Sequence, residues 1–167
     1  AVDYHDKHYL YANTQDSRYI AYAAYGSNPN DSYSLLKIIN TTTVTTSVIH
    51  YEACPVEDNE QPMVDCVKFS PDGKLIGMVK YIKSIEIHMD HRGDLNQFPG
   101  TISITPTNLK FALSIVFWDV ESHQQVISLE YHTDILDFCL SHGNNLLAVL
   151  GAMEGSSIEL WHIDETY

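Results

Sequence analysis

Two stretches of the chain decide its fold, because they repeat one pattern. Residues 64–79 read VDCVKFSPDGKLIGMV, and residues 135–150 read ILDFCLSHGNNLLAVL. Each holds a short apolar run with one aspartate, then a serine, a polar turn, a leucine and further apolar alternation. Alternation with a period of two in residues such as Val, Ile and Phe is typical of β-strands. Each stretch therefore predicts a strand, a tight turn and a second strand.

The match continues downstream of both stretches, where SIVFWDV at 114–120 corresponds to SIELWHI at 157–163. A weaker copy precedes them. In that copy YIAYAAYG (19–26) is expected as an inner strand, SLLKIIN (34–40) takes the place of SIVFWDV, and TVTTSVIHY (43–51) forms the outer strand. Self-similarity at about 40 to 50 residues is typical of propeller blades. The sequence predicts an all-β chain in which a four-strand unit recurs.

These repeats resemble the WD-repeat β-propeller family. Trp118-Asp119 matches the family's terminal dipeptide, and Trp161-His162 is a degraded second copy. His132 and Asp134 lie where the family usually has Gly-His and a short acidic turn, with Glu154 as the expected hydrogen-bond partner of the histidine. The resemblance implies a β-propeller segment of four-stranded antiparallel blades. It also implies a structural role for the repeat-motif residues Trp118, Asp119, His132, Asp134 and Trp161.

The whole of 1–167 is expected to form one segment of this kind, with blade-like units at 7–52, 64–131 and 134–167. A propeller closes with about four to eight blades, so three blades' worth of sequence predicts an incomplete ring or a fragment of one. Other protein subunits, which could supply the missing blades, are the expected partners.

The middle unit carries an inserted hairpin at 84–110, and such insertions are where repeat scaffolds place binding surfaces. Its candidate partner-binding residues are Ile87, His88, Met89, Arg92 and Phe98. Two histidines and Asp90 could ligate a transition metal, but on an extended strand His88 and His91 point to opposite faces. An exposed hairpin without metal is therefore expected. Arg92-Gly93-Asp94 is interpreted as a turn rather than as an adhesive tripeptide.

The charge narrows the function classes. Nine Lys+Arg stand against 22 Asp+Glu, which gives a net charge of −13. A nucleic-acid groove needs clustered cations, and an anionic membrane surface is disfavoured for the same reason. The two arginines, Arg18 and Arg92, are not adjacent, so the paired-arginine signature of phosphoinositide-binding propellers is missing. Three cysteines at wide spacing predict buried thiols rather than disulfides or zinc.

The sequence contains no nucleophile elbow, phosphate-binding glycine loop or metalloprotease motif, so neither catalysis nor a cofactor is expected. It also shows no signal-peptide pattern and no apolar run of bilayer length. We therefore expect a non-catalytic interaction scaffold in an intracellular multiprotein complex, in the cytoplasm or nucleus. Two alternatives stay open. One is a phosphoinositide-binding propeller of the autophagy or membrane-trafficking type, and the other is an adaptor that recognises a basic peptide, steered by the acidic stretch 52–65.

Overall fold

The computed structural model describes residues 6–87, 106–151 and 157–163, which form three antiparallel sheets. Blade 1 contains β1 (Asp6–Asn13), β2 (Tyr19–Ser27), β3 (Asp31–Asn40) and β4 (Thr45–Pro55). After the short 3-10 turn η1 (Val56–Asp58), blade 2 contains β5 (Glu60–Phe69), β6 (Leu75–Ile87), β7 (Pro106–Asp119) and β8 (Gln125–Glu130). Blade 3 contains β9 (Ile135–Leu140), β10 (Leu146–Gly151) and β11 (Ile158–His162).

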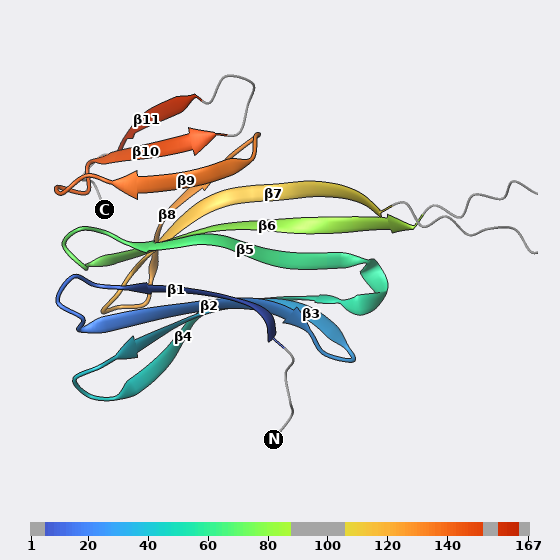
Figure 1. Ribbon diagram of the computed structural model, residues 1–167, viewed down its shortest axis with the longest axis horizontal. Helices are drawn as coiled ribbons and strands as arrows, with labels where there is room; N and C mark the ends of the chain where they lie inside the picture. The colour runs from blue at the N-terminus through green and yellow to red at the C-terminus, as the bar shows by residue number, and fades with distance from the viewer. Residues whose placement is uncertain (1–5, 88–105, 152–156, 164–167) are drawn as a thin grey trace, which may run out of the picture.

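Within each blade the strands follow one another as a meander, so every neighbour in sequence is a neighbour in the sheet. Figure 1 shows the three sheets stacked face to face, with blade 2 between the other two. Strand β5 contacts all four strands of blade 1, and it also contacts β9 of blade 3. The expectation of an all-β, propeller-like segment of antiparallel blades is confirmed.

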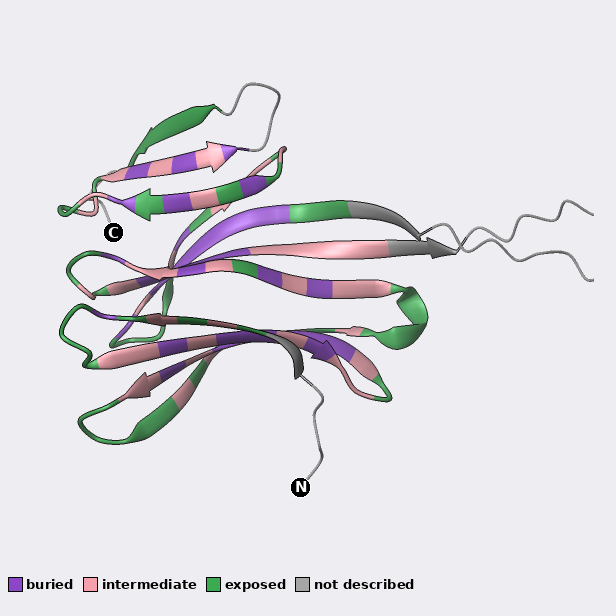
Figure 2. Ribbon diagram, viewed as in Figure 1, coloured by how far each residue is buried: buried purple, intermediate pink, exposed green. Residues whose placement is uncertain are grey.

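Two apolar cores hold the stack together, one on each side of blade 2. The first joins blades 1 and 2 through residues such as Leu36 and Met78, and the second joins blades 2 and 3 through residues such as Phe117 and Leu147. All four of these side chains are no more than 1% exposed. Figure 2 shows buried and more exposed positions alternating along β9 and β10, whereas β7 is buried without interruption over residues 113–118. Continuous burial is the pattern expected where both faces of the middle sheet are covered.

Several details differ from the sequence-based predictions. The segment DKHYLYAN forms β1, a strand that was not predicted, whereas YIAYAAYG lies inside the sheet as β2, as expected of an inner strand. Strand β1 was not predicted because its residues are a mixture of polar and aromatic types. An acidic run such as 52–65 is expected to form a solvated loop, but it lies mostly within β4 and β5.

The prediction of buried cysteines is also wrong, although all three are free thiols as expected. Cys139 is exposed, and Cys66 is half-buried. The strand period explains Cys139, since its neighbours Phe138 and Leu140 are the residues of β9 that face the core. Cys66 lies at an irregularity in the β5–β6 pairing and has a φ of +47°, as in a β-bulge.

The predicted insertion begins as an extension of the sheet. Strands β6 and β7 continue to pair as far as Ile87 opposite Pro106. Of the candidate partner-binding residues, Ile87 is the last residue of β6, and His88, Met89, Arg92 and Phe98 lie outside the described residues. The partner role of this hairpin therefore stays a prediction.

Candidate functional site

The same turn closes the first hairpin of each blade. It begins at Thr14 in blade 1, Ser70 in blade 2 and Ser141 in blade 3. In each case the backbone N–H of this residue donates to the carbonyl five positions on, at 2.8–3.0 Å. The N–H three positions on donates back to its carbonyl at 2.9 Å. These three turns place their side chains along one edge of the stacked sheets.

The side chains of the turns repeat as well. The hydroxyl of Thr14, Ser70 or Ser141 accepts a hydrogen bond from the N–H five positions on, at 2.9–3.1 Å. It donates to Asp16 at 2.7 Å, to Asp72 at 2.6 Å and to the amide oxygen of Asn145 at 2.9 Å, respectively. A small polar residue that bonds its own turn in this way favours a tight connection. The turn sequence is therefore part of the repeat.

Direct contacts link the three turns. The Asn144 side-chain amide donates to the second carboxylate oxygen of Asp72 at 2.7 Å, which joins blade 3 to blade 2. Gly73, whose φ is +72°, lies so near Thr14 that a Cβ on it would approach the threonine methyl to 3.3 Å. Blades 1 and 2 therefore also meet at their turns.

A second repeated turn lies beside the first, at the end of the third strand. Asp119 accepts hydrogen bonds from the N–H groups of Glu121 and Ser122 at 3.0 and 2.7 Å. Asn40 does the same for Thr42 and Thr43 in blade 1, at 3.0 and 3.2 Å. The aspartate of the Trp-Asp dipeptide thus organises the turn into β8, and Asn40 is its counterpart, which the sequence analysis did not identify.

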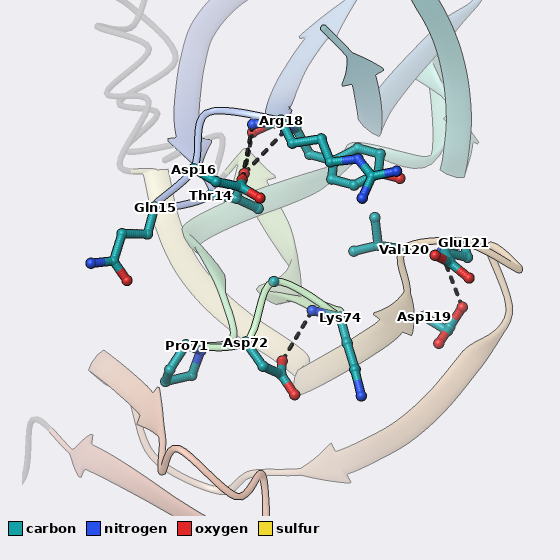
Figure 3. Close-up of a pocket in the computed structure, with 12 residues that line it drawn as sticks. Thr14, Gln15, Asp16, Arg18, Pro71, Asp72, Lys74, Asp119, Val120 and Glu121 are labelled. Atoms are coloured by element: carbon teal, nitrogen blue, oxygen red, sulfur yellow. Dashed lines mark hydrogen bonds between the residues drawn. The ribbon is translucent and has the colours of Figure 1, made fainter. Parts of the chain in front are cut away.

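Between blades 1 and 2 these turns enclose a pocket of about 710 Å³. Its walls come from the β1–β2 turn, the β5–β6 turn and the end of β7 (Figure 3). The lining includes four carboxylates and two cations: Asp16, Asp72, Asp119, Glu121, Arg18 and Lys74. The Arg18 guanidinium lies over the Tyr19 ring at 5.6 Å from its centre. Acidic groups therefore outnumber basic ones in this pocket.

Three of the four carboxylates have lowered pKa values. Hydrogen bonding from the Thr14 side chain is the main cause that lowers the pKa of Asp16, and the Ser122 backbone N–H is the main cause for Asp119. For Asp72 burial alone would raise the pKa, but hydrogen bonds from Ser70, Lys74 and Asn144 outweigh it and lower it. Groups of this kind remain ionised at neutral pH. They act as fixed anions and are poor proton donors.

The other predicted motif residues lie apart from this pocket. Trp118 is buried in the first core, where its ring is 5.4 Å from that of His50 on β4. Trp161 is 40% exposed and packs edge-on against Tyr131, whose hydroxyl donates to Glu159 at 2.7 Å. The structure brings each tryptophan against the preceding blade.

The predicted pairing of His132 with Glu154 lies partly outside the described residues. His132 is exposed in the connection between β8 and β9, and its proposed partner Glu154 lies outside the described residues. Asp134 pairs instead with Lys110, with 3.3 Å between the ammonium nitrogen and a carboxylate oxygen. Over residues 6–87, 106–151 and 157–163, no group of His, Cys, Asp and Glu is arranged to hold a metal ion.

The pocket residues of blade 1 were missed because the TQDSR turn differs from SPDGK in composition. The signal that could have found it is the spacing of a hydroxyl residue, an aspartate two positions later and a basic residue four positions later. Both Thr14-Gln15-Asp16-Ser17-Arg18 and Ser70-Pro71-Asp72-Gly73-Lys74 have this spacing.

Comparison with known proteins gives only distant likenesses, since no family model and no curated protein matches the chain. Among solved structures it is similar to hydrazine synthase from Kuenenia stuttgartiensis, at 12% identity and a TM-score of 0.48 over 89% of this chain and 38% of that one. It is also similar to a putative 6-phosphogluconolactonase from Bacteroides uniformis, at 10% identity and a TM-score of 0.33 over 93% and 67% of the two chains. An acylaminoacyl peptidase matches at 16% identity and a TM-score of 0.28 over 93% and 31%. The chain thus spans less than half of the first and third of these proteins. Within the described residues, no helix is long and apolar enough to cross a membrane.

Proposed function

We propose that this chain is a non-catalytic, WD-like propeller segment that serves as a protein-interaction scaffold in an intracellular multiprotein complex. In this proposal the pocket between blades 1 and 2 receives a basic side chain of a partner peptide. The observation that carries the proposal is the chemistry of that pocket, whose lining holds four carboxylates and two cations.

The hydrogen bonding of the carboxylates supports binding rather than catalysis. One oxygen of Asp16 and one of Asp119 serve their own turns, and both oxygens of Asp72 are used. A general acid needs a pKa near the working pH, whereas these carboxylates have lowered pKa values. Glu121 is exposed at the pocket. It is the carboxylate best placed to meet a partner.

The excess of acids also weighs against the phosphoinositide alternative. Arg18 and Lys74 both line the pocket, which is the one favourable sign for a phosphate ligand. A phosphate group bound in the pocket would nevertheless also face Asp16, Asp119 and Glu121, and these carboxylates would repel it. A cationic ligand fits the charge balance better.

Binding of a short fluorescein-labelled peptide of alternating lysine and glycine, followed by fluorescence polarisation, tests the proposal. Glu121→Lys is expected to weaken binding roughly fivefold, because changing one exposed charge pair is worth about 1 kcal/mol. The matched control is Glu130→Lys, since Glu130 is also exposed but lies on β8 away from the pocket lining. Equal weakening by both variants, or equal binding of an acidic peptide, contradicts the proposal. Ester, lactone or peptide hydrolysis that Glu121→Lys abolishes and Glu130→Lys spares would contradict the non-catalytic part.

A further inference from the structure

The repeat allows the faces of the three blades to be compared position by position. We call the face of a blade that points toward the next blade its leading face, and the opposite one its trailing face. Counted from the hydroxyl turns, corresponding cross-strand pairs on the leading faces are Ala21 and Ile38, Gly77 and Phe117, and Ala148 and Leu160. Corresponding pairs on the trailing faces are Tyr11 and Tyr22, Val67 and Met78, and Phe138 and Val149.

Inside the chain each leading pair is buried against the next trailing pair. Ala21 and Ile38 are 0% and 3% exposed in the first core, with Val67 and Met78 at 8% and 0%. In the second core Phe117, Phe138 and Val149 are 1%, 3% and 0% exposed. One type of interface is therefore used twice.

Size complementarity accompanies this interface. In the second core the Phe138 ring lies directly on Gly77, where a Cβ would approach it to 2.9 Å. The Phe117 and Phe138 rings meet edge to face at 5.6 Å between centres. In the second core the trailing face thus contributes an aromatic ring, and the leading face contributes a glycine to receive it; in the first core Val67 and Ala21 hold these two positions.

The two end faces of the stack carry the corresponding positions, and within the described part of the chain several of their side chains are largely exposed. On the leading face of blade 3, Leu160 is 69% exposed, and Ile158 is 70% exposed where its counterpart Ile115 is 0%. Ala148 is the small residue at the position of Gly77. On the trailing face of blade 1, Tyr11 is 67% exposed at the position of Phe138. One end therefore presents a small residue beside a leucine, and the other end presents an aromatic ring.

We propose that a second copy of this chain covers both end faces, with the leading face of blade 3 of each copy packed on the trailing face of blade 1 of the other. The end faces carry the positions that correspond to the two internal interfaces, so a second copy packed on them would continue the same type of interface. The contact is of the head-to-tail type, which closes a ring when the rotation allows it. Two copies supply six blades, within the roughly four to eight that close a propeller. This goes beyond the scaffold function and does not depend on the pocket.

Light scattering coupled to size-exclusion chromatography tests the proposal, in moderate salt that screens the net charge of −13 on each copy. The expected species has twice the chain mass of 18.9 kDa. Leu160→Asp and Tyr11→Asp are each expected to give monomers that keep the β-sheet circular dichroism spectrum, since both side chains are exposed within one copy. The matched control is Val44→Asp, at a residue that is 82% exposed in the turn before β4, and it is expected to remain dimeric.

An equimolar mixture of the two variants tests the head-to-tail orientation. In the mixed pair one interface is entirely wild type and the other carries both aspartates, so dimer mass returns although neither variant dimerises alone. The proposal is overturned by a monomeric wild type, by a dimer that survives either substitution, or by a mixture that stays monomeric. Covering of the faces by other blades, instead of by a second copy, would appear as the first of these results.

Discussion

Replacing Gly77 by alanine tests how closely Phe117 of the same blade and Phe138 of blade 3 pack on this position. A Cβ at this position would lie 2.3 Å from Cε1 of Phe117 and 2.9 Å from Cε2 of Phe138. Carbon atoms in contact normally lie about 3.5–4.0 Å apart, so the Phe117 ring would have to move by roughly 1 Å. Both rings lie in the second core, where neither is more than 3% exposed.

Overpacking of this kind costs about 1–3 kcal/mol of unfolding free energy. In a chain of 167 residues each 1 kcal/mol corresponds to roughly 2–4 °C in Tm. The measurement is urea unfolding followed by tryptophan fluorescence at one fixed protein concentration, because association would shift the apparent stability. Gly143→Ala is the matched control, since its Cβ would have a nearest contact of 3.4 Å. Its effect is expected to stay within about 0.5 kcal/mol.

A rescue follows from the repeat itself. Blade 1 has Ala21 opposite Ile38 where blade 2 has Gly77 opposite Phe117. The double variant Gly77→Ala with Phe117→Ile copies the blade 1 pair, and it should lose less stability than the two single variants together, with a coupling of about 1 kcal/mol. A Gly77→Ala variant as stable as Gly143→Ala, or a double variant with strictly additive losses, would refute the close packing of the two rings around Gly77.

Three further outcomes are expected. Burial, and secondarily Lys80, lower the pKa of His50 from 6.5. The unfolded chain therefore binds a proton at this histidine more tightly than the folded chain does. The contribution of His50 to the unfolding free energy is full above pH 6.5 and falls as the pH drops below it. In His50→Gln the urea concentration at the unfolding midpoint should depend less on pH between pH 5 and about 7.5. An unchanged pH dependence would contradict this and show that other groups determine it. Ser70→Ala removes the hydroxyl that bonds Leu75 and Asp72 at 2.9 and 2.6 Å, and it should cost about 1–2 kcal/mol in thermal unfolding. Ser122→Ala should cost less, because the Ser122 side chain is exposed, lies 3.4 Å from the Gln124 N–H and otherwise bonds Asp119, which keeps its two backbone donors. Finally, burial raises the pKa of the Cys66 thiol to about 11, so at pH 8 labelling with a thiol reagent should be at least about tenfold slower there than at the exposed Cys139. Cys139→Ser should remove the fast phase, and a single phase common to all three thiols would contradict this.

The strand pattern was predictable where short apolar runs are bounded by turn residues. The runs at 64–69, 75–82 and 146–151 lie within β5, β6 and β10, since they are short, rich in Val, Ile and Leu, and flanked by the Ser-Pro-Asp-Gly and Gly-Asn-Asn turns. Strand β1 was not predictable in this way, because its tyrosines, histidine and charged residues have no clear apolar period. It is a strand through its pairing with β2, which is a tertiary property.

The candidate site was only partly predictable. The Ser70 and Ser141 turns were recognised by their composition, and Asp119 by the Trp-Asp dipeptide. Thr14, Asp16 and Arg18 entered the site only because β1 pairs with β2 and brings their turn beside Gly73. A pocket between two sheets depends on which turns end at the same level, and spacing along the chain carries little information about that.

By itself the sequence determined that this chain is all-β and built from a repeated unit of short strands, because alternation and turn chemistry are local and act within a few residues. Only the tertiary structure decided which face of each strand is buried, how closely Phe138 approaches Gly77, and that Tyr11 and Leu160 occupy the positions of buried residues while remaining exposed. The physical reason is that burial belongs to a pair of faces. A single blade specifies its own alternation, but its neighbours decide whether that surface is removed from water.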